Sequence, residues 1–522
     1  MASYFGHSKK KKTLPIETKF KLPADIPDWP PGGDFSTGIV DLGCGLLVSQ
    51  ISTFKKIWTL CEGGPHDLGV TFFEPTGLPQ GFFILGCYCQ PNNKPLHGWV
   101  LVGKDTSSTT NASLTKPIDY KLVLNSKSFK IKQDGQGYIW LPLAPYGYKT
   151  IGYVVTTSPE KPSLEKIRCV RLDLTDECET NQSMLLYRTG YKRFNVYDVR
   201  PIKRGIEALG VQVGTFLVHN GGTNYNKTLP IACLKNTKAS LSSMPSLHQI
   251  EEIVKAYSPY MYLHPKEEYM PSSVEWFFTN GALLYEKRNG AIMENLITPT
   301  GSNLPQFGTK DDDGTSYYWL DLPLDEANRD RVKKGDLQSS HVYVHAKPML
   351  GGTFTDIVMW VFYPFNGGAR AKVACTNIPL RTKGEHVGDW EHVTLRVSNF
   401  NGELWKVYFS QHSKGQWVDV SELEFQYGNR PVVYSSLHGH AMFPKPGLVM
   451  QGTRGFGVRN DAAESEVVMD MENGFEVVAA EYLGSRITEP PWLNYWMNWG
   501  PKEGPKGPKW KDSWKGDESI LQ

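Results

Sequence analysis

The feature that most constrains the fold is an internal repeat in the first half of the chain. Each copy has an extended segment ending in proline, then two glycines five positions apart, and then a further strand-like segment. The glycine pairs are Gly81 and Gly86, Gly147 and Gly152, and, in a more divergent third copy, Gly205 and Gly210. Repetition of this kind indicates a repeat architecture. Three copies predict three small antiparallel sheets around a pseudo-threefold axis, a β-prism; a β-sandwich with glycine turns is the alternative.

Composition favours short strands joined by many turns. The 522 residues include 50 glycines and 35 prolines without a collagen-like period, which points to turns rather than long helices. Each glycine pair lies between two segments rich in aromatic and β-branched residues, which favour strands. These segments are residues 72–74 and 99–102 in the first copy, 138–141 and 167–171 in the second, and 196–199 and 229–234 in the third.

The length of the chain predicts at least two domains, because 522 residues exceed what one hydrophobic core normally supports. The pattern changes near residues 236–248, where a Ser-Ser-Met-Pro sequence at 242–245 offers a helix start. Apolar residues then recur at helical spacing as far as Tyr257. We therefore predict a basic, partly extended N-terminal segment over residues 1–30, a β-prism over 31–240, a second domain over 241–498 and a Lys- and Pro-rich tail over 499–522.

The second domain is predicted to be mainly β. Asn401-Gly402 is a strong hairpin signal between two apolar strands. The expected strands are residues 341–345, 356–365, 391–397, 404–410, 432–434 and 476–481. The whole chain is thus predicted to be mainly β, with an N-terminal β-prism of three pseudo-repeats followed by a β-sandwich with a few helices.

Charge and cysteine content restrict partners and compartment. The net charge of +2 does not favour nucleic-acid binding. Eight cysteines are too few for a disulfide-stapled scaffold of this length, so most are expected to be reduced core residues. The four lysines at 9–12 precede no apolar stretch, so no signal peptide is predicted, and no apolar run could span a bilayer as a helix. We predict a cytoplasmic protein in the producing cell, with peripheral membrane contact at most.

The main candidate site lies at residues 384–392, where a histidine and two carboxylates precede an apolar strand. Because side chains alternate along a strand, Asp389 and Glu391 share a face with Val393. Buried carboxylates need a cation or strong donors, and oxygen-rich ligation suits Mg²⁺ or Ca²⁺. The alternatives are pairing of both carboxylates with arginine, or a solvated rim at which His386 is only hydrogen-bonded.

Histidines also gather after the predicted hairpin. His412 is followed by His438 and His440, whose spacing puts both imidazoles on one side of a strand. Such a pair can bind a transition metal or transfer protons, although histidines with satisfied hydrogen bonds at loop junctions are the more ordinary interpretation. No Gly-x-Ser-x-Gly, phosphate-loop or His-Glu-x-x-His motif is present, which lowers the expectation of an enzyme.

Five segments, residues 269–274, 351–356, 384–391, 409–413 and 434–440, together resemble one family of plant proteins. Over residues 20–500 the chain resembles the plant vacuolar protein sorting-associated protein sixty-two-related family, which carries a domain of unknown function. Its first-half repeats are similar to β-prism modules that dock on membranes or adaptors in trafficking. Lectins and insecticidal toxins also use this fold, so the fold alone does not choose a function.

The second domain resembles the necrosis- and ethylene-inducing-like cytolysins. Those proteins have an actinoporin-like sandwich and a Gly-His-Arg-His-Asp-Trp-Glu signature that helps to hold a divalent metal. The resemblance implies that His386, Asp389 and Glu391 are metal-linked and that Trp390 is the signature tryptophan. Asn366 stands where the family has an aspartate, and the second signature histidine is a glycine here. One negative charge fewer should lower the affinity for a hard cation.

These resemblances imply a non-enzymatic plant defence protein, insecticidal and membrane-permeabilising, that binds a membrane lipid, a glycan or a membrane receptor and oligomerises on the membrane. The first alternative is an intracellular vacuolar trafficking adaptor. The second is a metal-dependent hydrolase with Glu391 or Asp389 as general base. The expected Mg²⁺ or Ca²⁺ ligands are His386, Asp389, Glu391 and Asn366, with an accessory site formed by Trp390, His412, His438 and His440.

Overall fold

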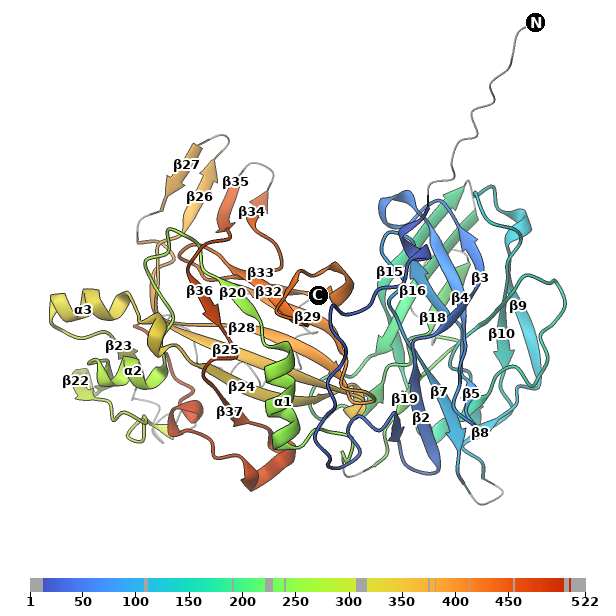
Figure 1. The fold of residues 1–522 in the computed structure, drawn as a ribbon, viewed down its shortest axis with the longest axis horizontal. Helices are drawn as coiled ribbons and strands as arrows, with labels where there is room; N and C mark the ends of the chain where they lie inside the picture. Colours follow the sequence, from blue (N-terminus) through green and yellow to red (C-terminus); the bar gives the residue numbers. More distant parts are fainter. Residues whose placement is uncertain are drawn as a thin grey trace, which may run out of the picture. The chain divides into compact units, whose positions relative to one another are not determined.

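The computed structural model shows a mainly β protein (Figure 1). It describes residues 13–107, 111–189, 192–220, 229–238, 241–306, 317–373, 376–380, 382–412, 414–453, 456–501 and 507. The predicted features at Lys9 to Lys12 and most of the 499–522 tail lie outside these residues. The chain forms two compact units, the first made of Met1–Lys21, Gly38–Lys203 and Leu209–Ala239 and the second of Leu22–Thr37, Arg204–Ala208 and Ser240–Gln522.

The first unit contains three copies of one six-strand pattern, which confirms the predicted pseudo-repeats. In every copy, the first strand pairs with the sixth and the sixth with the fourth, while the second pairs with the third and the third with the fifth. All these pairs are antiparallel. Each copy therefore has two three-stranded sheets where one had been predicted, and β1 (Ile39–Asp41) extends one sheet of the first copy.

The strands of the first copy are β2 (Leu46–Ile51), β3 (Phe54–Leu60), β4 (Val70–Pro75), β5 (Phe83–Ile84), β6 (Tyr88–Pro91) and β7 (Val100–Asp105). Those of the second copy are β8 (Leu114–Thr115), β9 (Asp119–Asn125), β10 (Tyr138–Leu143), β11 (Tyr148–Lys149), β12 (Val154–Thr156) and β13 (Cys169–Arg171). Those of the third copy are β14 (Thr175–Asp176), β15 (Cys178–Thr189), β16 (Lys192–Pro201), β17 (Gly210–Val211), β18 (Phe216–Asn220) and β19 (Cys233–Lys235).

The three copies close into a ring through equivalent backbone hydrogen bonds. In each, an N–H at or just before the sixth strand of one copy donates to a carbonyl near the fourth strand of another. The three bonds are Arg168 to Ile84 at 3.0 Å, Ala232 to Thr150 at 2.9 Å and Leu101 to Val213 at 2.9 Å. Because these bonds link the second copy to the first, the third to the second and the first to the third, they support the closed pseudo-threefold arrangement of a β-prism.

Gly86, Gly152 and Thr215 meet where the three copies come together. A Cβ on Gly86 would lie 2.6 Å from the Thr215 methyl and 2.8 Å from the Cα of Gly152. The repeat alignment was therefore wrong in the third copy, because Thr215, and not Gly210, is the residue equivalent to Gly86 and Gly152. Gly205 lies in a turn before β17 and adopts a φ of 117°, so the five-residue spacing between Gly205 and Gly210 does not mark the point where the copies meet.

The core of the first unit is aromatic and rich in thiols. Trp58 stacks on Phe72 with ring centroids 5.1 Å apart, and Phe72 contacts Phe216. The seven cysteines that the structure describes are all free, and five of them are buried, as expected for reduced core residues. Burial raises the pKa of the Cys87 thiol to about 12, so this thiol stays protonated.

The second unit is built around two packed sheets, as predicted for a β-sandwich. The larger sheet has the strand order β30-β29-β28-β25-β24-β37, and the smaller has the order β31-β32-β20-β36 with β33 beside β32. Strand β33 packs against β28 and β29 of the larger sheet. The larger sheet consists of β24 (Val342–Met349), β25 (Phe354–Asn366), β28 (His386–Ser398), β29 (Leu404–Gln411), β30 (Lys414–Asp419) and β37 (Phe475–Ala479). The smaller consists of β20 (Tyr260–Tyr262), β31 (Phe425–Gln426), β32 (Arg430–Ser435), β33 (Met442–Phe443) and β36 (Val468–Asp470).

Two smaller sheets flank the sandwich (Figure 1). The first joins β22 (Ala291–Leu296), β21 (Leu283–Arg288) and β23 (Tyr317–Asp321), with α2 (Val274–Thr279) and α3 (Glu326–Lys333) beside it in the chain. The second joins β27 (Thr376–Pro379), β26 (Arg370–Val373), β35 (Phe456–Ala462) and β34 (Gly447–Thr453). The second of these sheets forms one wall of the site described below.

The predicted helix is present as α1 (Leu247–Tyr257), but it starts later than expected. Ser246, not a residue of the 242–245 sequence, caps it, and the Ser246 and Gln249 side chains form a capping box. The Gln249 amide also donates to the carbonyls of Pro30 and Gly32 at 2.7 and 3.0 Å. These two bonds help to explain why the segment Leu22–Thr37 belongs to the second unit.

The hairpin predicted at Asn401-Gly402 is confirmed. Strands β28 and β29 are antiparallel and flank this turn, in which Gly402 has a φ of 73°. Within the described residues, no helix has the length and apolar character needed to cross a lipid bilayer.

Candidate functional site

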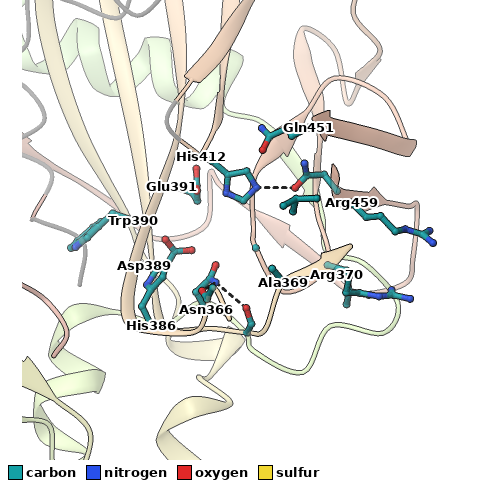
Figure 2. Close-up of a pocket in the computed structure, with 16 residues that line it drawn as sticks. Asn366, Ala369, Arg370, His386, Asp389, Trp390, Glu391, His412, Gln451 and Arg459 are labelled. Carbon is teal, nitrogen blue, oxygen red and sulfur yellow. Dashed lines mark hydrogen bonds between the residues drawn. The ribbon is translucent and has the colours of Figure 1, made fainter. Parts of the chain in front are cut away.

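A cavity of about 410 Å³ opens in the second unit beside the start of β28 (Figure 2). Its walls come from the end of β25, the start of β28, the loop after β32 and the β26–β35–β34 sheet. The polar and charged side chains around it are those of Asn366, Arg370, His386, Asp389, Glu391, His412, Gln451, Arg459 and Asn460. The cavity therefore brings together all four residues predicted as metal ligands, and Trp390 and His412 of the predicted accessory site are also among the residues that line it.

Asp389 and Glu391 lie on the face of β28 that was predicted. Both residues are 6% exposed, and they share a face with the buried Val393. Trp390 points to the opposite face, away from the carboxylates (Figure 2). The carboxylates thus enter the interior between the two sheets, where an unpaired charge would be costly.

A chain of buried ionisable groups holds Asp389. The Oδ2 atom of Asp389 lies 2.9 Å from Nδ1 of His440, and Nε2 of His440 lies 3.8 Å from Oε1 of Glu267. The imidazole is 0% exposed and stacks on Tyr363 with ring centroids 3.8 Å apart. His440 therefore bridges two buried carboxylates, and the arginine partner considered as an alternative for Asp389 is a histidine instead.

The electrostatics of this chain favour a protonated His440. Burial alone would lower the pKa of His440, but the hydrogen bonds and charges of Asp389 and Glu267 outweigh burial and raise it to about 10. Burial would likewise raise the pKa of Glu267, but hydrogen bonds from His438 and His440 hold it far below its usual range. These shifts favour an imidazolium held between two carboxylates behind the cavity.

Glu267 was not predicted as a site residue. Its Oε1 accepts the N–H groups of Glu268 and Tyr269, at 3.1 and 3.0 Å, and its Oε2 accepts the N–H of His438 at 2.6 Å. It thereby ties the loop before α2 to the loop after β32. Lys266, Glu267 and Glu268 are three consecutive charged residues, a pattern typical of a solvated turn. No sequence signal therefore marked Glu267 as buried.

The other predicted ligands have hydrogen bonds of their own. Ser410 donates to Glu391 in a short contact. The Nδ1 atom of His386 lies 3.0 Å from the Gly388 carbonyl, so Nδ1 donates this bond and Nε2 is the ring nitrogen left for a ligand. The Asn366 amide nitrogen donates to the carbonyls of residues 367 and 384 at 3.0 and 2.8 Å, which leaves the amide oxygen as its ligand atom.

The histidine pair does not lie on a strand, so the predicted reason for its proximity was wrong. His438 and His440 occupy the loop between β32 and β33 with φ values of 67° and 51°, a left-handed conformation that is uncommon for residues other than glycine. Both nevertheless reach Glu267, at 3.5 and 3.8 Å. His412 is separate from them and lies 2.9 Å from Oδ1 of Asn460 across the cavity (Figure 2).

The structure explains the glycine in place of the second signature histidine. Gly388 has a φ of 67°, and a Cβ there would lie 2.5 Å from the Trp499 carbonyl oxygen. Any side chain at this position would therefore need a different path for the segment around Trp499. Among the described residues, no three His, Cys, Asp or Glu side chains are grouped as a preformed metal site, so the metal stays a prediction that rests on two carboxylates, an amide oxygen and an imidazole.

Trp390 has a structural role on the far side of β28. It is 1% exposed and packs against Phe362, Trp492 and Trp499, with centroids 5.0 to 5.7 Å apart. Replacing Trp390 with phenylalanine should lower the free energy of unfolding by about 1–2 kcal/mol, because part of this packing is lost. Chemical denaturation should show that loss, while ligand titrations of the cavity should be unchanged; an altered ligand affinity would contradict the placement.

Comparison with known proteins bears on family and fold. Functionally curated proteins give no match. GNIP1Aa from Chromobacterium piscinae is 18% identical, with a TM-score of 0.30, and the similarity covers 40% of this chain and 40% of that one. Necrosis and Ethylene inducing Protein 2, from the causal agent of cocoa's witches' broom disease, is 10% identical, with a TM-score of 0.22, covering 46% of this chain and 77% of that one. NLPPya in complex with mannosamine is 10% identical, with a TM-score of 0.25, covering 52% and 89%.

These structural likenesses include necrosis- and ethylene-inducing proteins, as the resemblance of the second domain implied. The chain spans only 40% of the length of GNIP1Aa, and TM-scores this low carry no functional argument. The family assignment has a firmer basis, because the model of one family matches residues 16–502. The chain therefore belongs to the vacuolar protein sorting-associated protein 62 family.

Proposed function

We propose that this protein is a non-enzymatic recognition protein whose second unit binds a glycan of a membrane surface or membrane receptor, in a defence role that includes membrane damage. The observation that carries the proposal is the polar cavity beside β28, with its two buried carboxylates and its ring of amide and imidazole groups. Hydroxyl-rich ligands are bound by such groups through several directed hydrogen bonds.

The charges around the cavity favour a neutral or cationic ligand. Arg459 pairs with Asp461 at the rim, and Arg370 lies 3.6 Å from the same carboxylate. Asp461 offsets one of these two positive charges, and His440 offsets one of the three acids behind the cavity, which are Asp389, Glu391 and Glu267. The net charge of these groups therefore stays negative. An amino sugar, which combines hydroxyl groups with an ammonium group, is therefore the best-matched small probe.

The oxygen and nitrogen atoms around the cavity also suit a hard divalent cation. The carboxylates of Asp389 and Glu391, the amide oxygen of Asn366 and Nε2 of His386 would hold Mg²⁺ or Ca²⁺, which would present a positive charge to sugar hydroxyl groups. Binding is favoured over hydrolysis because the candidate bases are engaged: Asp389 with His440 and Glu391 with Ser410.

Calorimetric titration of the intact protein tests the proposal. Glucosamine, mannosamine, Mg²⁺ and Ca²⁺ are titrated separately, and each sugar is then titrated in the presence of either cation. We expect saturable sugar binding that a cation strengthens. Absence of binding by both sugars and both cations would overturn the proposal.

Asn366 provides the matched variants for the cation. Asn366→Asp restores a carboxylate without changing side-chain size, and we expect it to raise cation affinity on the order of tenfold. Asn366→Ala removes the ligand oxygen and should lower the affinity. Equal cation affinities for wild type and both variants would exclude Asn366 as a ligand.

A further inference from the structure

The three-stranded sheet β22–β21–β23 has a solvent face of unusual composition. Its inner face supplies Leu284 and Leu320, which are buried in a hydrophobic core of the second unit. When one face of an antiparallel sheet is buried, the other is normally polar. Here the outer face presents Ile292, Leu296 and Tyr317, whose exposed fractions are 59%, 74% and 37%.

Strand register makes these side chains one continuous surface. Ile292 and Tyr317 are both paired with Lys287, from its two neighbouring strands, and directly paired residues project to the same side of a sheet. Trp319 and Tyr285 are also paired and stack with ring centroids 5.2 Å apart and planes 10° apart. We call this surface the outer face; its exposed and half-buried side chains are those of Tyr285, Lys287, Ile292, Glu294, Leu296, Tyr317, Trp319 and Asp321.

Strand β22 presents this surface at the edge of the sheet. All six of its residues are exposed, and β21 is its only partner among the described strands. A two-residue turn joins the strands, with φ values of 50° at Asn289 and 82° at Gly290, as in the tight hairpins that match strand twist. The hairpin therefore holds its apolar side chains in fixed positions in water.

The tip of the hairpin carries more cations than acids. Lys287 and Arg288 are exposed at the turn, and neither forms an ion pair with a described residue. Among the acids of the sheet, Glu286 accepts a 3.1 Å hydrogen bond from Tyr318, Asp321 lies 3.3 Å from Arg329, and Glu294 is exposed on the outer face opposite Tyr285. The two cations at the tip outnumber Glu294, so the tip complements a negatively charged surface.

We propose that the outer face docks on a phospholipid bilayer that contains anionic headgroups. Tryptophan and tyrosine favour the headgroup level, aliphatic side chains such as Ile292 and Leu296 favour the layer beneath it, and the long stem of Lys287 lets its charge reach phosphate. A second copy of the chain is a poorer match, because pairing along the free edge of β22 would leave the outer face in water.

This inference rests on the proposed function only in placing the protein at a membrane, and it requires neither a sugar nor a cation in the cavity. Its test is therefore sedimentation with sugar-free vesicles in a chelating buffer. Phosphatidylcholine vesicles are compared with vesicles that also contain phosphatidylserine. We expect the intact protein to bind the second kind more tightly, and absence of binding to them would overturn the proposal.

Two variants and a control locate the contact. Ile292→Asn with Leu296→Asn should weaken binding to phosphatidylserine vesicles about tenfold or more, because the inserted apolar area is lost. Lys287→Glu with Arg288→Glu should remove the preference for phosphatidylserine. The control, Ile118→Asn with Leu186→Asn, changes side chains of the first unit that are 65% and 59% exposed, and it should bind as wild type does.

Circular dichroism confirms that each variant is folded, so a loss of binding reports on the surface itself. Wild-type binding by the Ile292 and Leu296 variant would overturn the proposal. So would a concentration-dependent dimer, seen by ultracentrifugation without vesicles, that this variant converts to a monomer, because a second copy would then cover the outer face. Either result leaves the calorimetric test of the cavity unaffected.

Discussion

Replacing His440 with alanine should lower the free energy of unfolding of the second unit by about 3–5 kcal/mol, because the change leaves two buried carboxylates without their shared cation. Asp389 and Glu267 are 6% and 7% exposed, so water cannot replace the imidazolium fully. Chemical denaturation of the intact protein, followed by a signal from the second unit, measures the loss.

A matched control is available in the same cavity. His412 is also a histidine in a left-handed conformation, but its partner is the neutral side chain of Asn460, and His412 is exposed. His412→Ala should therefore cost about 1 kcal/mol or less. Similar losses for the two variants would show that the buried charges are not the source of the effect.

The His440 effect should also depend on pH. A histidine whose pKa is raised by folding stabilises the folded state fully below its unfolded pKa of about 6.5, and this contribution disappears as pH rises toward the folded value of about 10. The stability difference between wild type and His440→Ala should therefore shrink between these limits. A difference that stays constant from pH 6 to 10 would contradict a protonated His440.

Replacing Gly152 with alanine should destabilise the first unit by about 3 kcal/mol, because the added methyl has no space. Its Cβ would lie 2.7 Å from the Thr215 methyl and 2.9 Å from the Cα of Gly86. The Gly86 contact is with backbone and cannot be relieved by rotation of a side chain. Thermal or chemical unfolding monitored in the first unit provides the measurement.

Two further variants separate crowding from backbone strain. Gly147→Ala adds a methyl into open space at a φ of 82°, so it should cost about 1 kcal/mol through conformation alone. Adding Thr215→Ala to Gly152→Ala should recover part of the loss, because one of the two close contacts disappears. Failure of Thr215→Ala to help at all would argue against a meeting point of the three copies.

The periodic features of the fold could be predicted from sequence. Turn glycines and proline-terminated strands repeat because each copy must make the same tight turn, and Asn401-Gly402 specifies a hairpin through local geometry alone. The third copy was misaligned because Thr215 is tolerated where the other copies need glycine. No local pattern distinguishes a glycine needed for close approach from one needed for a turn, such as Gly205.

The site was predicted where it depends on one strand and missed where it depends on several. Alternation along β28 placed Asp389 and Glu391 on the inner face, and the structure confirms that placement. Glu267 and His440 are far apart in the sequence, so their contact depends on how two loops pack against each other. The unusual backbone conformation of His438 and His440 is likewise set by that packing, and residue spacing does not reveal it.

The most direct test of the account is anomalous diffraction from crystals of the intact protein grown with Mn²⁺, which takes the oxygen-rich sites of Mg²⁺ and Ca²⁺. The account predicts an anomalous peak inside the cavity, in contact with Asn366, Asp389 and Glu391. Peaks only elsewhere on the protein, or no peak while Asp389 remains paired with His440 and Glu391 with Ser410, would contradict it.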